Sequence, residues 1–392
     1  MKSIKKKLKI CMYTPTADGG HARYTFELLT SIMKQREDQE IDAELVTSVN
    51  ISKNYISDKY KINNILPILK DKFCFNNKIE WVLSRVIYYL KREILFFKWI
   101  KKRKDFNIIH FQEYAHFLGV IFFRLFKKNG FKIIYTVHNI YDHKYPFKWL
   151  QPFIDYSNKI SWKLCDALIV HSESLKKQLR VFLGKGTPPI YVIPHPVWTI
   201  NRKIEIIRDP SSKMINKTLI FFGVIRPNKG LHYLLEAMLL IKNYKLIIAG
   251  SFQDIEYQAK IKNMIKDQEK NIILIDRYIS SDEMIELFVN SSAAILPYES
   301  FYAQSGVLHD AISLETPVVV TNVGALGEYV KKYDIGQVVD PGDARQLAKA
   351  IVSLHNKDRY FKVINNIRNL KNLFSSDLTG LKTIRLYKNI LI

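Results

Sequence analysis

The sequence predicts an α/β protein with two parallel sheets, and three observations support this expectation. Short, continuously apolar runs recur along the chain, amphipathic stretches of helical length separate them, and one polar segment divides the pattern into two similar halves. Continuous apolar runs are typical of strands buried on both faces of a parallel sheet, and the intervening helices provide the crossovers that parallel strands need. We therefore expect two α/β domains.

The first half begins with a strand at 9–14, which ends at Pro15 and is followed by an amphipathic helix at 22–34. Further apolar runs predict strands at 41–49, 108–111, 132–138, 167–171 and 191–193. Helices are expected at 80–103 and 159–165. This half is predicted to form one domain over residues 1–198.

The second half follows a polar segment, 199–216, whose Pro210-Ser211-Ser212 is typical of a linker. Its apolar runs predict strands at 218–223, 245–249, 272–275, 293–296, 317–321 and 336–339. Helices are expected between them at 231–240, 255–267, 281–290, 306–314 and 344–355. We expect a second domain over residues 217–372.

The composition is that of a globular protein, because 47% of the 392 residues are hydrophobic and 25% are charged. The net charge of +23 has three explanations: solvated lysines, attraction to anionic lipid headgroups, or nucleic acid. No zinc-finger spacing, recognition-helix pattern or RNP-like aromatic motif accompanies the charge, which argues against nucleic acid. Cys11, Cys74 and Cys165 share no metal-ligand or C-x-x-C spacing, so we expect neither a zinc site nor a disulfide framework, and a cytoplasmic location.

The most membrane-like stretch, 81–100, contains five charged residues and is not expected to span a bilayer; no secretory signal is expected either. The surrounding basic, aromatic-rich segment 73–103 has two interpretations. It is either a domain helix that covers the sheet, or an interfacial helix that buries Trp81, Tyr88 and Leu95 in lipid while its lysines meet headgroups.

Four segments contain candidate functional residues, all at the carboxyl ends of predicted strands, where ligands of open α/β sheets bind. Gly19-Gly20 and the segment around Ser305-Gly306 each precede a helix, whose free N–H groups attract anions. Arg226 and Lys229 lie three residues apart beside another helix start, a spacing that suits phosphate binding. His138 ends a buried strand, and His110, His171 and His195 occupy comparable places. Each segment alone is equally compatible with an ordinary turn or a structural histidine.

The motifs FFGVIRPNKGLHYLLEA, LIIAGS, YISSDEMIELFVNSSAAILPY and SGVLHDAISLETPVVVTNVGALGEYV follow one another in an order and spacing that resembles retaining glycosyltransferase family 4. In the first half, IIHFQ, TVHN, ALIVHSESLKKQL and VIPHPV agree with this resemblance, which covers residues 9–355. The resemblance implies the GT-B architecture: two Rossmann-like domains that face a central cleft, with a C-terminal helix, 373–392, returning to the first domain.

The resemblance also implies a metal-independent transfer of a sugar, with retention, from a UDP- or GDP-linked donor to a glycan or lipid-linked acceptor of the cell surface, on the inner face of the membrane. The implied catalytic residues are His138, Arg226 and Lys229. The implied donor-binding residues are Gly19, Gly20, Arg226, Lys229, Tyr278, Ile279, Glu299, Gln304, Ser305, Gly306, Val307 and Asp310.

The sequence departs from the family's pair of glutamates, because Asp310 replaces the second and Tyr302 stands in place of the first. Glu299 or Gln304 is expected to take over the contact with the donor sugar. Two alternatives remain at this point. One is a nucleotide-sugar epimerase of the same fold, and the other is a non-catalytic glycan- or lipid-binding partner of another transferase.

Overall fold

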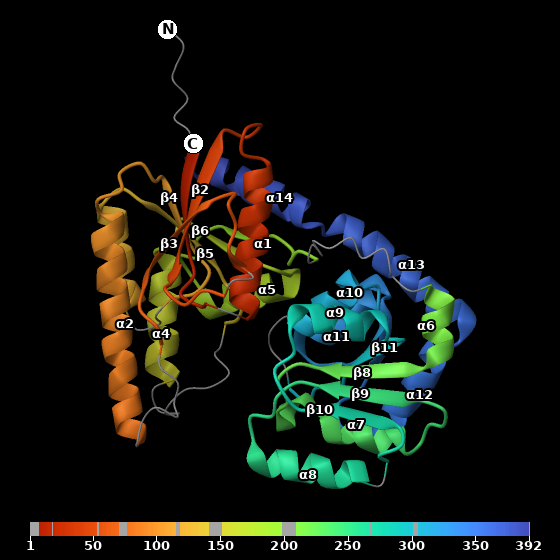
Figure 1. Ribbon diagram of the computed structural model, residues 1–392. Coiled ribbons are helices and arrows are strands. Elements are labelled where there is room, and N and C mark those ends of the chain that lie inside the picture. The colour runs from red at the N-terminus through yellow and green to blue at the C-terminus, as the bar shows by residue number, and fades with distance from the viewer. Residues whose placement is uncertain are drawn as a thin grey trace. The chain divides into compact units, whose positions relative to one another are not determined.

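The computed structural model describes residues 8–17, 19–52, 55–69, 77–114, 118–140, 151–197, 209–266, 268–300 and 305–391 (Figure 1). The chain divides into two compact units. Unit 1 combines Met1–Pro196 with Ser376–Ile392, and unit 2 is Val197–Ser375. Each unit has its own sheet and its own hydrophobic core.

Unit 1 contains a parallel sheet of seven strands among the described residues, in the order β3-β2-β1-β4-β5-β6-β7. The strands are β1 (Leu8–Tyr13), β2 (Ile41–Ser48), β3 (Lys61–Leu66), β4 (Ile108–Phe111), β5 (Lys132–Thr136), β6 (Ala167–Val170) and β7 (Ile190–Val192). All four residues of β4 and of β6 are buried, as expected of central strands covered on both faces. The predicted parallel sheet is thereby confirmed.

The helices of unit 1 pack along this sheet. They are α1 (Gly20–Lys34), α2 (Lys78–Ile100), α3 (Gly119–Lys128), α4 (Gln151–Lys163), α5 (Glu173–Leu183) and α14 (Ser376–Leu391). The last helix, α14, lies beside α1, where Ser31 Oγ donates to the Ser376 carbonyl at 2.6 Å. A Cβ placed on Gly380 would lie 2.1 Å from Ser31 Oγ, so only glycine lets the two helices approach this closely.

Unit 2 contains a parallel sheet of six strands within the described ranges, in the order β10-β9-β8-β11-β12-β13. The strands are β8 (Thr218–Phe222), β9 (Lys245–Ala249), β10 (Ile272–Ile275), β11 (Ala293–Leu296), β12 (Val318–Thr321) and β13 (Gly336–Val339). The helices are α6 (Pro210–Asn216), the 3-10 helix η4 (Pro227–Lys229), α7 (Leu231–Met238), α8 (Ile255–Lys266), α9 (Ser281–Val289), α10 (Gly306–Ser313), α11 (Gly324–Tyr333), α12 (Ala344–Leu354) and α13 (Lys357–Leu373).

Three elements differ from the sequence-based expectations: helix α6, strand β3, and helix α11, which forms where no helix was expected. The predicted linker 199–216 ends in helix α6, because Asp209 accepts a hydrogen bond from Ser212 N at 3.2 Å and Pro210 occupies the first helical turn. Strand β3 was not predicted, because it is an edge strand whose polar residues break the apolar pattern. Its Asn63 is nevertheless buried and donates to Glu44 at 3.0 Å.

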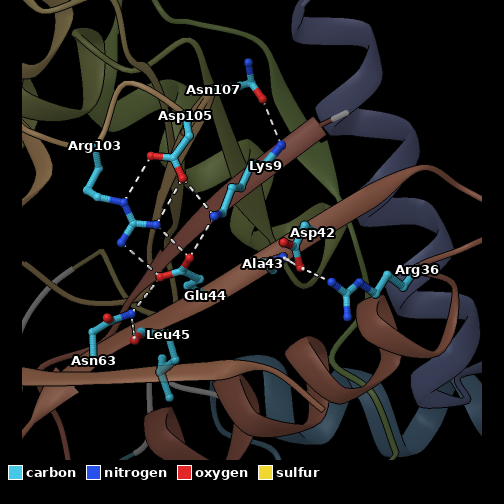
Figure 2. Close-up of polar contacts among 10 residues, drawn as sticks. All are labelled: Lys9, Arg36, Asp42, Ala43, Glu44, Leu45, Asn63, Arg103, Asp105 and Asn107. Atoms are coloured by element: carbon cyan, nitrogen blue, oxygen red, sulfur yellow. Dashed lines mark hydrogen bonds and ion pairs between the residues drawn. The ribbon is translucent and has the colours of Figure 1, made fainter. Parts of the chain in front are cut away.

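A closed network of alternating charges ties β1 and β2 to the segment after α2 (Figure 2). Lys9 Nζ lies 2.8 Å from both Glu44 Oε1 and Asp105 Oδ2, and Arg103 Nη2 lies 2.7 Å from Glu44 and 3.0 Å from Asp105. Burial alone would raise the pKa of Glu44, but hydrogen bonds from Arg103, Lys9 and Asn63 lower it to about 2. The network therefore fixes the carboxyl end of α2 on the sheet of unit 1.

Candidate active site

The loop after β8 places Lys229 next to the start of helix α10. Gly223 follows the strand with φ 98°, η4 ends at Lys229, and Gly230 with φ 65° begins α7. A Cβ placed on Gly230 would lie 1.9 Å from the Pro297 carbonyl oxygen. Only glycine therefore allows this loop to lie directly against the end of β11.

The Lys229 ammonium lies in a small polar cluster of unit 2. Its Nζ donates to Tyr298 OH at 3.1 Å and lies 4.6 Å from the centre of the Tyr298 ring. Tyr298 OH in turn lies 3.5 Å from Ser305 Oγ, which caps α10 by accepting from Leu308 N. A half-buried cation therefore lies close to a helix N-terminus, and both attract anions.

Gly223, Val307 and Gly306 lie around the loop that holds this cation. A Cβ placed on Gly223 would lie 3.5 Å from Val307 Cγ2 and 4.0 Å from Lys229 Nζ, so the end of β8, Lys229 and the first turn of α10 meet at one place. A Cβ on Gly306 would meet no atom within 4 Å. The structure thus brings together the predicted residues Lys229, Ser305, Gly306 and Val307.

Other predicted residues of unit 2 have separate contacts. Arg226 Nε donates to Gln253 Oε1 at 2.6 Å, which holds the guanidinium on the β9 side of the loop. Glu299 is exposed, and its Oε1 lies 3.5 Å from His232 Nε2. Asp310 is buried within α10, one turn after Gly306.

Two predicted residues follow β10, and the predicted Gln304 lies outside the described residues, as does Tyr302, which stands in place of the family's first glutamate. Ile279 is buried, whereas Tyr278 is 69% exposed, so the tyrosine ring is the one of the pair that a ligand can reach. Gln304 and Tyr302 fall in the range 301–304, which the structure does not describe.

In unit 1, the predicted Gly19-Gly20 turn forms the N-terminus of α1. Gly19 has φ 84°, a left-handed conformation that favours glycine, and it caps the helix. A Cβ placed on either glycine would meet no atom within 4 Å, so a ligand could approach the backbone here.

His138 belongs to a cluster of aromatic rings at the carboxyl ends of β4, β5 and β6. The His21 ring stacks on the His138 ring with centroids 4.5 Å apart, and His171 Nε2 lies 3.1 Å from His138 Nδ1. Tyr24 packs its ring against His138, His171 and His195, with centroids 5.0–5.1 Å apart. His138 is half-buried, whereas His171 is buried.

The hydrogen bonds of His171 determine which nitrogen of His138 carries a hydrogen. His171 Nδ1 faces the Ile193 carbonyl at 3.0 Å, so it donates, and the Nε2 of the neutral ring accepts. His138 Nδ1 therefore donates to His171, which leaves the lone pair of neutral His138 on Nε2. That atom lies 3.3 Å from Gln112 Oε1, so a hydrogen bond between them requires the Gln112 amide to be turned so that its NH2 group donates.

Three histidines of this cluster, His138, His171 and His110, are neutral near pH 7. Burial lowers the pKa of His171 to about 4 and that of His110 to about 3. Burial and the neighbouring imidazoles hold the pKa of His138 well below its ordinary value. This side of unit 1 therefore presents neutral His138 and His171 rings rather than imidazolium cations.

Three further residues of unit 1 belong to this site without having been predicted: Tyr24, Gln112 and Glu113. Burial opposes the charged carboxylate, but hydrogen bonds from His21 and Thr16 lower the pKa of Glu113 to about 2. Gln112 and Glu113 directly follow β4. Both residues lie at the carboxyl end of a strand. This is the feature from which His138 was predicted, so the sequence also contained the signal for Gln112 and Glu113.

The two sets of residues lie in different units, and a site shared between the units remains a prediction. Within the described part of the chain, no group of three or more His, Cys, Asp or Glu side chains is arranged to hold a metal ion. Over the same residues, none of the helices is both long and apolar enough to cross a membrane.

Comparison with known proteins identifies both units. Residues 70–199 match the family model described as Glycosyltransferase Family 4, and residues 203–370 match Glycosyl transferases group 1. An uncharacterised glycosyltransferase of Methanocaldococcus jannaschii is 26% identical over 58% of this chain. The capsular polysaccharide biosynthesis glycosyltransferase CapM of Staphylococcus aureus is 26% identical over 49% of it. The matches span only 61% and 50% of those two proteins.

Solved structures share the fold over the whole chain. HepE of Anabaena, crystallised with UDP-glucose, superimposes with a TM-score of 0.68 at 13% identity, covering 97% of this chain and 100% of HepE. Both units, in order, thus match a Family 4 and a group 1 glycosyltransferase domain. The chain belongs to the family 4 glycosyltransferases and has their GT-B fold.

Proposed function

We propose that this protein transfers a sugar from a nucleoside-diphosphate sugar to a glycan or lipid-linked acceptor, with retention and without a metal ion. One observation carries the proposal: the Lys229 ammonium lies close to the N-terminus of α10, where Gly223 and Gly306 carry no side chains. This arrangement suits a diphosphate, which the ammonium and the free N–H groups of the helix would both contact.

The same arrangement supports a role in catalysis. Negative charge develops on the diphosphate as the bond to the sugar breaks, and a cation that is already in place stabilises it without reorganisation. Lys229 is held by Tyr298 before any ligand arrives. Arg226 and the first N–H groups of α10 would share the charge, which is the work that a metal ion does in other transferases.

We assign the donor to the UDP- or GDP-linked sugars. HepE, which shares the fold, was crystallised with UDP-glucose. In unit 2, the exposed Tyr278 ring and buried Ile279 would flank the base, and Asp310 would take the ribose hydroxyls. In unit 1, His138 would face the donor sugar.

We further propose that the product belongs to a cell-surface polysaccharide and that the reaction takes place in the cytoplasm. The similarity to CapM supports the first statement. The second is supported by Cys11 and Cys165, which are buried free thiols, since a reducing compartment maintains such groups.

A donor screen tests the proposal. The purified protein is incubated with UDP, GDP and ADP and with their hexose conjugates, and its thermal midpoint is measured. A ligand at 100 times its Kd stabilises a protein by about 2.7 kcal/mol, so one nucleotide series should raise the midpoint clearly.

The stabilising donor is then supplied without an acceptor, and its slow hydrolysis is followed by NMR in the presence of a chelator. Release of a sugar with the donor's anomeric configuration supports a retaining, metal-independent reaction. An inverted product, or activity that requires added metal, contradicts that part of the proposal. If no nucleotide raises the midpoint, the diphosphate site is wrong.

A further inference from the structure

Helix α2 presents a continuous apolar face to solvent. Six side chains share this face, and their exposed fractions range from 37% to 70%. They are Ile79, Leu83, Val86, Ile87, Leu90 and Ile94. Their spacings of four, three, one, three and four residues place them on one side of the helix. Single exposed apolar residues are ordinary, but a contiguous stripe along one helix marks an interaction surface.

Contacts with the rest of unit 1 fix the orientation of α2, so that this apolar face remains exposed to solvent. The opposite side of α2 packs into the core through Phe96 and Ile100, neither of which is exposed. At the carboxyl end of the helix, Arg103 joins the network with Glu44 and Asp105 shown in Figure 2. The orange helix in Figure 1 lies at the outside of unit 1 and extends beyond the strands. Rotation of α2 that would hide the stripe would break these contacts.

The three residues that the sequence suggested would face lipid are not equally exposed. Leu95 is 37% exposed, whereas Trp81 and Tyr88 are half-buried. The Arg85 guanidinium lies 4.7 Å from the Trp81 ring, and that of the buried Arg92 lies 5.6 Å from the Tyr88 ring. The two aromatic side chains therefore contact cations of α2 itself, and the side chains of its exposed apolar stripe are aliphatic.

Basic side chains border the apolar stripe. Lys91 and Lys98 are exposed, and helical geometry places both along one edge of it. Among the described residues of α2 the acids are Glu80, at the first turn, and Glu93, which is buried. The outer face is therefore apolar at its centre and positively charged at one edge.

A groove continues this surface at the carboxyl end of α2. It has a volume of about 390 Å³ and is lined by Ile65, Leu95, Lys98, Trp99, Lys102 and Arg103. Three of these residues are apolar and three are cations. A groove with an apolar lining and a cationic rim matches the junction between an acyl chain and an anionic headgroup.

We propose that this outer face of α2, with the adjoining groove, binds the surface of a membrane that contains anionic lipids. The charge selects this partner: a second copy of the chain would bring a face of equal positive charge against Lys91 and Lys98, whereas an anionic bilayer neutralises both lysines. The apolar stripe would enter the interfacial region while the helix lies in the plane of the membrane. This surface is distinct from the diphosphate site of unit 2.

Flotation with vesicles tests the proposal on the whole protein, without donor or acceptor. Wild type should float with vesicles of phosphatidylglycerol and phosphatidylcholine, and poorly with phosphatidylcholine alone. The double variant Leu83→Ser/Ile87→Ser should bind the anionic vesicles at least about tenfold more weakly, since each buried aliphatic side chain contributes about a factor of ten. Lys91→Gln/Lys98→Gln should lose about fivefold per lysine, and only on anionic vesicles.

A matched control replaces exposed aliphatic residues by serine on two other helices. Val181 on α5 and Ile255 on α8 are 85% and 83% exposed, so Val181→Ser/Ile255→Ser should float like wild type. Three results would overturn the proposal: no flotation of the wild type, equal flotation of wild type and the α2 variant, or equal loss in the control. A dimer that the α2 substitutions dissociate, without vesicle binding, would assign the face to a second copy instead. Since the assay reads only lipid binding, it is independent of whether the donor site is correct.

Discussion

Lys229 is the side chain on which the proposed chemistry depends most directly. Its ammonium contacts Tyr298 and is therefore positioned before a ligand binds. Loss of one preorganised charge partner lowers turnover by about 10²–10³, or about 2.7–4 kcal/mol. Lys229→Ala should show this loss in kcat while nucleotide affinity falls less, because Arg226 and the N–H groups of α10 remain.

The matched control is Lys349→Ala on α12, an exposed lysine of the same unit. It should retain wild-type turnover, and both variants should keep the thermal midpoint. A folded Lys229→Ala protein with wild-type activity would show that the diphosphate binds elsewhere.

The charge network at Glu44 predicts how the stability of unit 1 depends on pH (Figure 2). Glu44 has a pKa of about 2 in the folded protein, against an ordinary value of 4.5. The unfolded chain therefore binds more protons between these values. The stabilisation is complete above about pH 4.5 and is lost as the pH falls toward 2. Urea unfolding across this range should show the decline.

Glu44→Gln should lower the free energy of unfolding at pH 7 by about 2 kcal/mol, because it removes the carboxylate that accepts hydrogen bonds from both cations of this partly buried network. Asp42→Asn is the control, since Asp42 pairs with Arg36 at 3.5 Å nearer the surface. It should cost about 0–1 kcal/mol. Equal effects of the two substitutions would contradict the assigned role of the network.

Site residues could be predicted from the sequence where they directly follow a predicted strand or lie in a turn. Lys229, Ser305, Gly306 and Val307 follow strands, and the structure places them together. The histidine cluster was predictable only in part. His138 and His171 lie at the ends of strands, whereas Tyr24 lies on a helix. No spacing in the sequence predicts that the Tyr24 ring packs against three histidines. Such contacts between elements depend on packing.

At the scale of elements, Lys213 fastens helix α6 to unit 2. This lysine is buried, and its Nζ lies 3.5 Å and 3.3 Å from the carbonyl oxygens of Leu314 and Glu315 and 3.1 Å from Thr316 Oγ1. Burial lowers the pKa of Lys213 to about 8. The Glu315 side chain in turn pairs with Arg368 and Lys371 of α13.

Lys213→Ala should therefore destabilise the protein by about 2–5 kcal/mol, because it removes a buried side chain and leaves carbonyl groups without a donor. Ile215→Ala on the same helix is the control, since Ile215 is 73% exposed, and it should change stability by less than about 0.5 kcal/mol. Denaturant unfolding monitored by circular dichroism measures both. If Lys213→Ala matches its control, α6 is not held by this contact.

Most strands were predicted from their continuous apolar runs, whereas strand β3 and helices α6 and α11 were not expected. The strands from β8 to β13 are confirmed because each is a short apolar run between turn signals. Strand β3 was not predicted because it contains the polar Asn63. This side chain can be buried because it donates a hydrogen bond to Glu44, which lies 19 residues away along the chain. Helix α6 was not predicted because the residues at its start, Asp209 and Pro210, are also common in linkers.

At the scale of the whole molecule, two separate cores predict two unfolding transitions. Two glycine substitutions should act on one unit each. A Cβ on Gly380 would lie 2.1 Å from Ser31 Oγ in unit 1, and a Cβ on Gly336 would lie 2.0 Å from the Val318 carbonyl oxygen in unit 2. Each Gly→Ala change should cost about 1–3 kcal/mol through overpacking.

Calorimetry of the two variants measures this. Gly380→Ala should lower only the transition of unit 1, and Gly336→Ala only that of unit 2, and each variant is the control for the other. A single transition that shifts equally in both variants would mean that the two cores unfold as one cooperative unit.

The return of α14 to unit 1 has a consequence for the order of events during synthesis. The chain leaves unit 1 at Pro196 and returns at Ser376, and the two crossings are side by side, since Val197 N donates to the Phe374 carbonyl at 2.8 Å. A ribosome therefore completes every residue of unit 2 before it releases the helix that supplies Tyr387, the partner of buried His110 at 2.7 Å. The domain encoded first is thus finished last, and until then the nascent chain presents the uncovered side of α1 to chaperones.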